Sequence, residues 1–263
     1  EQINRLNSLD QIGTAQNYER SLKSLLEFTS LNTTETITRL LFQEISPNWL
    51  DRYEKYMTDI KKRSPTTISM YLRCLRAVFN NAIAEKDIER ENYPFGRRKY
   101  QIPASTKVKK AIDKAKLKVL YEAVPKTPEQ EKARDFWFFS FFCNGINIKD
   151  IALLKFKDLK DNFLTLIRAK TKKTSKANLK HLSIYVNEAA MNILLKYANP
   201  IQNPDSYIFS IINLTDSEIQ KYNKVKNFTR FINQNLKKLA IENGLTGEVS
   251  TYWARHSFAT IAM

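Results

Sequence analysis

The residues that could do chemistry stand near the end of the chain, where Arg255 and His256 lie side by side in an otherwise apolar run, residues 251–260. The apolar neighbours are compatible with a helix that would bury much of this run and leave the guanidinium of Arg255 in a largely dry place. Such an arginine needs an anionic partner, because desolvating an unpaired guanidinium is costly, and its planar fork suits a phosphate. The alternative is a structural helix with Arg255 facing solvent and His256 hydrogen-bonded.

The charge balance favours a polyanionic partner. The chain has 43 Lys and Arg against 27 Asp and Glu, a net charge of +16, and such an excess makes affinity for a polyanion steeply salt-dependent. A proteome rich in lysine is the alternative explanation, but the charge is concentrated in two stretches. Residues 96–118 hold one acid and nine basic residues, Arg97, Arg98, Lys99, Lys107, Lys109, Lys110, Lys114, Lys116 and Lys118. Residues 168–180 hold no acid and six basic residues, Arg168, Lys170, Lys172, Lys173, Lys176 and Lys180.

Several classes of protein are disfavoured by composition. The sequence has no apolar run long enough to span a membrane and no secretory signal at its start. Cys74 and Cys143 are far apart in apolar contexts, so we expect free thiols in a reducing cytoplasm. With only two histidines, a His-based zinc site is not expected.

Periodicity predicts a mainly α fold with a small antiparallel sheet, in the α+β class. Helices are expected at about 15–28, from 47, and from 65 in the first half, and at 114–123, 128–143, 148–155, 188–197 and 223–242 in the second. Two alternating segments, 163–168 and 181–186, predict the strands of a hairpin. We expect a helical domain over residues 1–95, a basic linker over 96–111 and a mixed domain over 112–263.

The run YWARHSFAT, residues 252–260, resembles the second signature box of the tyrosine recombinase (phage integrase) family, written His-x-x-Arg-His-x-Phe-Ala-Thr. The order of elements in the second half is similar to that family's catalytic domain. The resemblance implies a site-specific recombinase that breaks and rejoins DNA through a 3′-phosphotyrosine intermediate, to integrate or excise a mobile element. It also implies that no metal or nucleotide cofactor takes part, and that the protein works on the bacterial nucleoid in the cytoplasm.

The resemblance implies a role for each matching residue of the site. Arg255 would clamp the phosphate, and Lys170, at the family's hairpin lysine, would be the general acid, with Lys172 or Lys173 as alternatives. Tyr252 stands where the family usually has histidine, and its hydroxyl could still donate to a phosphate oxygen. His256 is expected to support this segment rather than to act as the acid. The nucleophilic tyrosine is expected after Met263, so residues 1–263 alone are expected to bind DNA without cleaving it.

The first signature box departs from the family. The run NGINIKDI, residues 144–151, resembles Gly-x-Arg-x-x-Asp/Glu-Ile/Leu, with Asn147 in the place of the arginine. Loss of a charged donor would cost about 2.7–4 kcal/mol of transition-state stabilisation. Lys149 or Arg134 is expected to substitute, unless the enzyme is slow. Integrases of Bacteroides-type mobile elements are known for departures at this box, and the chain resembles that branch best.

The first half resembles the family's core-binding domain. A Ser-Pro-Thr-Thr start at residues 64–67, followed by YLRCLRAVF at 71–79, is similar to the helix that faces DNA in that domain. A solvated helix face is the alternative for its arginines. The expected DNA contacts are Thr66, Thr67, Arg73 and Arg76 on this helix, Arg97, Arg98, Lys99 and Lys107 in the linker, and Lys172 and Lys173 in the hairpin.

The resemblance further implies partners. These are double-stranded DNA with inverted core sites, other copies of the chain in a tetramer on DNA, and an accessory DNA-bending protein. Two alternatives remain open from sequence: a catalytically inactive DNA-binding relative, which Asn147 and Tyr252 would suit, and a relative of the type IB topoisomerases.

Overall fold

The chain folds into two compact units. A computed structural model describes residues 1–32, 37–104, 111–172, 178–200, 203–245 and 249–261. Unit 1 comprises Glu1–Val108 and unit 2 comprises Lys109–Met263; each is described by itself. No helix within the described ranges is both long and apolar enough to cross a membrane.

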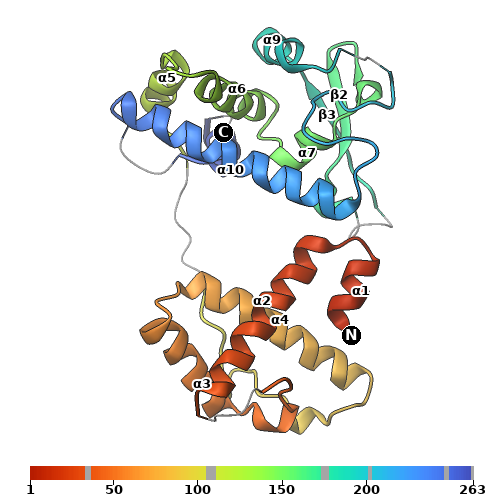
Figure 1. The fold of residues 1–263 in the computed structure, drawn as a ribbon, viewed down its shortest axis with the longest axis vertical. Helices are drawn as coiled ribbons and strands as arrows, with labels where there is room; N and C mark the ends of the chain where they lie inside the picture. Colours follow the sequence, from red (N-terminus) through yellow and green to blue (C-terminus); the bar gives the residue numbers. More distant parts are fainter. Residues whose placement is uncertain (33–36, 105–110, 173–177, 201–202, 246–248, 262–263) are drawn as a thin grey trace. The chain divides into compact units, whose positions relative to one another are not determined.

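Unit 1 is helical (Figure 1). Its α-helices are α1 (Gln2–Ser8), α2 (Ile12–Thr29), α3 (Pro47–Lys55) and α4 (Pro65–Ala84), and α3 continues as one π-helical turn, Tyr56–Ile60. Short 3₁₀ turns lie at Ser30–Asn32, Phe42–Glu44 and Arg90–Asn92.

The two Ser-Pro pairs begin α3 and α4 in the same way. The hydroxyl oxygen of Ser46 accepts a hydrogen bond from the backbone N–H of Trp49 at 3.2 Å, and that of Ser64 accepts from Thr67 at 3.4 Å. Each serine satisfies a backbone donor that has no partner within the helix, and the proline that follows needs no such partner. Both predicted helix starts are confirmed.

Aromatic side chains fill the core of unit 1. Phe79 is fully buried and its ring meets those of Phe42 at 4.8 Å and Phe95 at 5.9 Å between centroids. Tyr100 is also buried, and its hydroxyl donates to Glu54. The first residues of the predicted linker therefore fold onto unit 1.

Unit 2 combines helices with a three-stranded antiparallel sheet in the order β1-β2-β3. Its elements are α5 (Lys114–Glu122), α6 (Pro128–Phe142), α7 (Ile148–Leu153), β1 (Leu159–Lys160), β2 (Phe163–Ile167), α8 (Ala169–Lys172), β3 (His181–Tyr185), α9 (Glu188–Tyr197), α10 (Glu218–Glu242) and α11 (Thr251–Ile261), with a 3₁₀ turn at Phe156–Asp158. The register pairs Leu164 with Ile184 across β2 and β3. The predicted fold class, mainly α with a small antiparallel sheet, is confirmed.

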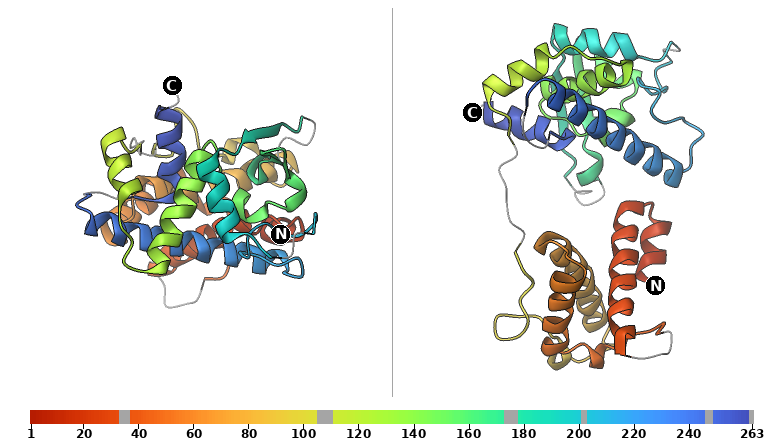
Figure 2. Two further views of the ribbon diagram at one scale, coloured as in Figure 1. Left: turned by 90° about the horizontal axis from the view of Figure 1, so that it is seen from above. Right: turned by 60° about the vertical axis from the view of Figure 1, so that its left-hand side comes forward.

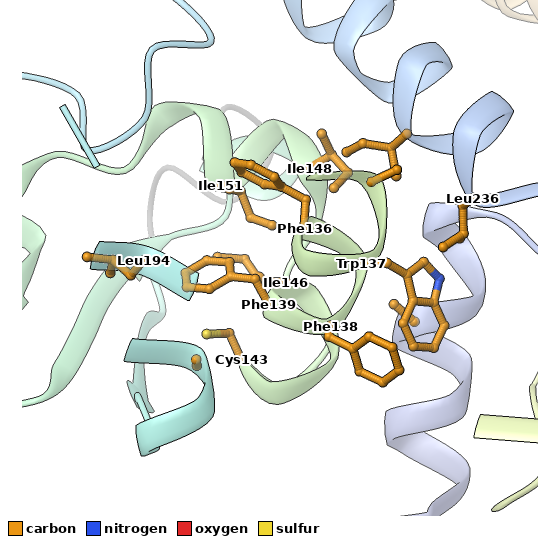
Figure 3. Packing of buried hydrophobic residues seen from close by; sticks show 14 of the residues in the cluster. Phe136, Trp137, Phe138, Phe139, Cys143, Ile146, Ile148, Ile151, Leu194 and Leu236 are labelled. Carbon is orange, nitrogen blue, oxygen red and sulfur yellow. The ribbon is translucent and has the colours of Figure 1, made fainter. Parts of the chain in front are cut away.

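Helix α6 is the centre of the core of unit 2 (Figure 3). Phe136, Trp137 and Phe139 are at most 1% exposed, so the second half of α6 is apolar around most of its surface. The helix packs against α9, α10 and α11. Cys143 at its end is a buried free thiol whose pKa burial raises to about 12. The indole N–H of Trp137 donates to the carbonyl of Ser250 at 2.9 Å, which fixes the residue before α11.

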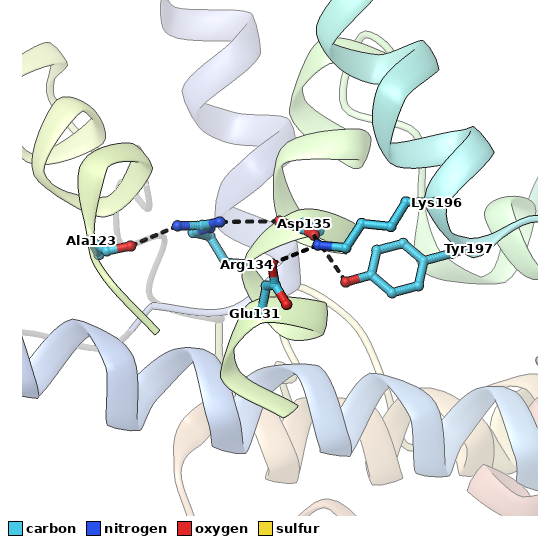
Figure 4. Close-up of polar contacts among 6 residues, drawn as sticks. All are labelled: Ala123, Glu131, Arg134, Asp135, Lys196 and Tyr197. Atoms are coloured by element: carbon cyan, nitrogen blue, oxygen red, sulfur yellow. Dashed lines mark hydrogen bonds and ion pairs between the residues drawn. The ribbon is translucent and has the colours of Figure 1, made fainter. Parts of the chain in front are cut away.

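A polar network joins α6 to α9 (Figure 4). The carboxylate of Asp135 accepts from the ammonium of Lys196 at 2.8 Å and from the hydroxyl of Tyr197 at 2.9 Å. Burial, and then the hydrogen bond to Asp135, raise the pKa of Tyr197 to about 12. The guanidinium of Arg134 donates to the carbonyl of Ala123, after the last turn of α5, at 2.6 Å.

For two buried serines of unit 1, we predict that replacement by alanine changes the free energy of unfolding in opposite directions. Both are 2% exposed. The hydroxyl of Ser21 donates to the carbonyl of Tyr71 at 2.9 Å and joins α2 to α4, whereas that of Ser69 has no hydrogen-bond partner among the described residues. Replacing Ser69 with alanine removes an unsatisfied buried group and should raise the free energy of unfolding by about 1 kcal/mol. The matched change Ser21→Ala should lower it by about 1 kcal/mol.

Hydrogen exchange of the α4 amides across a denaturant series reports the stability of unit 1 within the whole chain. A loss of stability of the same size in both variants would contradict the assignment of the two hydroxyls.

Candidate functional site

Helix α11 carries the residues of the second signature box. Ala254 and Ser257 are fully buried and define its inner side. Arg255 and His256 are half-buried, and Tyr252 is 54% exposed. The rings of Tyr252 and His256 meet edge to face with centroids 4.5 Å apart. His256 therefore supports Tyr252 by contact, and Arg255 lies at the boundary between core and solvent.

Two hydrogen bonds hold α11 in place, one at its first residue and one in its second turn. The backbone N–H of Thr251 donates to the side-chain oxygen of Asn233 on α10 at 2.8 Å, which caps the start of α11. The hydroxyl oxygen of Ser257 accepts from the backbone N–H of Ile112 at 2.8 Å. The backbone that carries Arg255 is thus tied to both the beginning of unit 2 and the middle of α10.

The two signature boxes meet at Gly145. Its φ of +68° lies in the left-handed region, which glycine adopts without steric cost. A Cβ atom added there would lie 2.6 Å from the Cα of Arg255, closer than two carbon atoms can approach. The turn after α6 therefore packs directly against the backbone of Arg255, and only glycine fits the contact.

The buried carboxylate of Asp150 joins α7 to the segment that follows β2. Asp150 is 7% exposed and accepts a hydrogen bond from the backbone N–H of Ala169 at 2.8 Å. Burial raises its pKa, while the bond from Ala169 and the positive charges of Arg168, Lys149 and Arg255 lower it. The positive charges that act on this carboxylate thus come from the end of β2, from α7 and from α11, and a surplus of positive charge favours an anion such as a phosphate group.

Asn147 acts as the N-cap of α7. Its side-chain oxygen accepts from the backbone N–H of Lys149 at 3.0 Å, and its side chain is exposed. Of the two cations predicted to replace the absent arginine, Arg134 donates to Ala123 and lies beside Asp135 in the network of Figure 4. Lys149 is exposed, and its positive charge lowers the pKa of the adjacent Asp150.

Lys170 is exposed on α8, directly after Ala169. The sequence predicts a turn at this place, whereas the structure has a one-turn helix, Ala169–Lys172. Because the backbone N–H of Ala169 donates to Asp150, the start of this helix is held at that carboxylate. The side chain of Lys172, and all of Lys173, lie outside the described residues.

The predicted DNA contacts on α4 form an exposed face. Thr66, Arg73 and Arg76 are exposed, and Thr67 is half-buried, with its hydroxyl 3.2 Å from that of Ser64. Both arginines therefore point away from the core of unit 1 and are available to a partner.

The predicted contacts after α4 differ in their accessibility. Arg97, Arg98 and Lys99 are all exposed, but the ammonium of Lys99 donates to the carbonyl of Tyr93 at 2.6 Å and stabilises the loop of unit 1. Lys107 lies outside the described residues.

Asp150 was not predicted as a site residue, although it stands in the first signature box. The signal available from the sequence was an acid followed by Ile151 and Ala152 in a short apolar helix, a position where a charged residue needs partners. Ala169 gave no signal, because it contributes only its backbone N–H.

One family model matches the first part of the chain. Residues 1–102 match the family model of the phage integrase SAM-like domain. A search of curated protein sequences returns no match.

Solved structures resemble the whole chain. The lambda integrase dimer bound to a core site matches with a TM-score of 0.62 at 15% identity, over 97% of this chain and 83% of that chain. The Tn1549 transposon integrase in complex with transposon right-end DNA gives 0.63 at 16% identity, over 95% and 80%. The XerH site-specific recombinase bound to its difH substrate gives 0.59 at 16% identity, over 99% and 74%. The chain has the tyrosine recombinase fold.

The contact between Gly145 and Arg255 predicts that one methyl group added at position 145 strongly lowers the stability of unit 2. Gly145→Ala should lower the free energy of unfolding of unit 2 through an unfavourable left-handed backbone, about 1–2 kcal/mol, and through the clash with Arg255, a further 1–3 kcal/mol or so. Gly244, with a φ of +73° and no atom within 4 Å of an added Cβ, is the matched control. Gly244→Ala should show the backbone cost alone.

Hydrogen exchange of the α6 amides in denaturant compares the two variants. Equal losses of stability would mean that Gly145 and Arg255 are not in contact.

Proposed function

We propose that this chain is the DNA-binding and catalytic part of a tyrosine recombinase that breaks and rejoins DNA through a 3′-phosphotyrosine intermediate. The observation that carries the proposal is the buried carboxylate of Asp150, which accepts a hydrogen bond from Ala169 and whose pKa is lowered by the positive charges of Arg168, Lys149 and Arg255. A second anion, the scissile phosphate, would complete the charge balance of this site.

Each step of the reaction has a candidate residue. Negative charge grows on the nonbridging oxygens of the phosphate as the nucleophile attacks, and Arg255 is positioned by two hydrogen-bonded neighbours to neutralise it. Lys170 would protonate the leaving 5′-oxygen as general acid. The exposed hydroxyl of Tyr252 would donate to a phosphate oxygen, and His256 would hold the ring of Tyr252. The nucleophile would be a tyrosine beyond residue 263.

Arg168 and Lys149 are proposed to supply the charge that Asn147 lacks. The positive charges of both lower the pKa of Asp150, as does that of Arg255, and Arg168 contributes most of the three. Asn147 keeps a structural role as the cap of α7. A guanidinium from the end of β2 would thus replace one from the start of α7.

The proposed partner is double-stranded DNA with inverted core sites, bound by unit 2 and by the exposed arginines of α4. A lambda integrase tetramer bound to a Holliday junction has the same fold, with a TM-score of 0.59 at 14% identity over 98% of this chain and 70% of that chain. We extend that assembly to this chain as a tetramer on DNA, aided by an accessory DNA-bending protein. Its role would be integration or excision of a Bacteroides-type mobile element in the bacterial cytoplasm.

The test of this function uses the gene product extended beyond residue 263 and a nicked duplex of its own attachment site. A covalent protein–DNA band is expected on a denaturing gel, mapped by mass spectrometry to one tyrosine. Arg255→Gln should reduce its rate of formation about 10²–10³-fold, as loss of a charge-stabilising donor does, while Lys160→Gln, an exposed lysine on β1, should leave it unchanged.

Asn147 and Tyr252 favour a second candidate, a catalytically inactive DNA-binding relative. Tight sequence-specific binding in a native gel with no covalent band would establish that candidate in place of the recombinase.

The replacement of the missing arginine has its own test. Arg168→Gln should slow covalent-band formation about 10²-fold or more, and Lys149→Gln should slow it less, because an ammonium lacks the planar fork of a guanidinium. Adding Asn147→Arg to the Arg168→Gln variant should restore part of the lost rate. If Arg168→Gln has no effect on the rate while Asn147→Arg alone raises it above that of the wild-type protein, Arg168 does not replace the missing arginine.

A further inference from the structure

Unit 1 contains a pocket that the proposed function leaves unused. The pocket has a volume of about 390 Å³ and is lined by α1, α2, α4 and the segments before α3 and after α4. Figures 1 and 2 show α1 and α2 side by side in unit 1, and α4 also packs on α2. Sites for small organic molecules have volumes of roughly 300–1,000 Å³ and mostly apolar walls. The pocket is therefore large enough for such a molecule.

Apolar side chains from three segments form the walls of the pocket. Leu22 and Leu25 come from α2, Leu75 and Val78 from α4, and Phe42 from the 3₁₀ turn before α3. Leu25 and Leu75 are buried, whereas Leu22 is 44% exposed. An apolar ligand that covers Leu22 and its neighbours would remove this surface from water, which favours binding.

Two polar groups in the pocket are neutral. The thiol of Cys74 and the hydroxyl of Tyr18 both line it, and the side chain of Tyr18 is hydrogen-bonded to Gln2. Burial raises the pKa of Cys74 and of Tyr18, so both side chains are uncharged near neutral pH. The interior of the pocket therefore offers no charge to a ligand.

The charged residues that line the pocket are mostly acidic. Glu85 and Asp87 follow the last turn of α4, Glu1 precedes α1, and Arg5 is the one base among the described lining residues. All four are exposed, and none of them forms an ion pair with another residue of the described ranges. In a chain with a net charge of +16, this rim is a local excess of negative charge.

The end of α4 strengthens the negative charge of the rim. The last carbonyl groups of a helix carry partial negative charge and favour a cation nearby. The last turn of α4 has no basic residue, and Glu85 is its C-cap. Lys86, between the two acids, is exposed and does not line the pocket. Glu85 and Asp87 therefore add to the charge at this helix end, and a cation in the pocket would offset both.

We propose that this pocket binds a small molecule with an apolar body and one cationic group, such as a primary ammonium. The body would lie against Leu25 and Leu75, and the ammonium would lie near Glu85 and Asp87. The inference goes beyond the proposed function and does not depend on it.

Phenylbutylammonium, phenylbutanol and phenylbutanoate are probes of similar shape and different charge. Their binding to the whole chain is measured from the methyl resonances of leucine, isoleucine and valine. The ammonium should shift the resonances of Leu22, Leu25, Leu75 and Val78 in a saturable way. It should bind about 2- to 10-fold more tightly than the alcohol, as expected for pairing with exposed acids, and the carboxylate should bind most weakly.

Glu85→Gln combined with Asp87→Asn tests the role of the rim. This variant should lose the preference for the ammonium over the alcohol, while its affinity for the alcohol stays the same. Glu89→Gln combined with Glu91→Gln is the matched control, because both acids are exposed near the same loop and neither lines the pocket. The control should keep the full preference.

Alkylation of Cys74 by iodoacetamide locates the bound probe. Cys143 is buried, whereas Cys74 is half-buried and lines the pocket. At about ten times its dissociation constant, phenylbutylammonium should slow the alkylation of Cys74 about tenfold by mass action.

Equal affinity for the three probes, or the absence of saturable methyl shifts, would overturn the inference. Protection of Cys74 that rises with protein concentration alone would also overturn it, because a second copy of the chain would then cover the pocket. None of these outcomes bears on the proposed function, which the covalent-band assay tests.

Discussion

The burial of one carboxylate constrains the rest of the candidate site. Asp150 loses most of its hydration on folding, and its compensation comes from the N–H of Ala169 and from the charges of Arg168, Lys149 and Arg255. In the absence of this carboxylate, nothing would offset the mutual repulsion of those cations. With it, the end of β2, α7 and α11 can each bring a positive charge that acts on the same carboxylate. The net positive charge that remains suits an incoming phosphate better than it suits the free protein.

Rigid packing behind the site makes this charge arrangement possible. The aromatic residues in the second half of α6 are buried in the core of unit 2, and Trp137 fixes Ser250 just before α11. Gly145 allows the turn after α6 to touch the backbone of Arg255. Lys170 on α8 and Tyr252 on α11 remain exposed at the surface of unit 2.

Features with a local cause were predictable from the sequence. The Ser-Pro pairs at residues 46 and 64 and the cap at Asn187 begin helices where expected. Helix α10 starts earlier than its apolar pattern because a capping box, Ser217 with Gln220, adds a polar first turn. Strand β1 was missed because two residues show no alternation; the signal was Asp161-Asn162, whose positive φ values form a tight hairpin turn. The contacts of Asp150 with Ala169 and of Gly145 with Arg255 join distant segments, so no local pattern could reveal them.

The most direct measurement of the central claim is the structure of this chain bound to a duplex that it selects. The distance between the guanidinium of Arg255 and the nearest phosphate oxygen decides the matter. The account predicts a hydrogen bond between them, with the carboxylate of Asp150 still accepting from Ala169. A DNA complex in which Arg255 faces only protein carboxylates, and every phosphate lies beyond its reach, would contradict it.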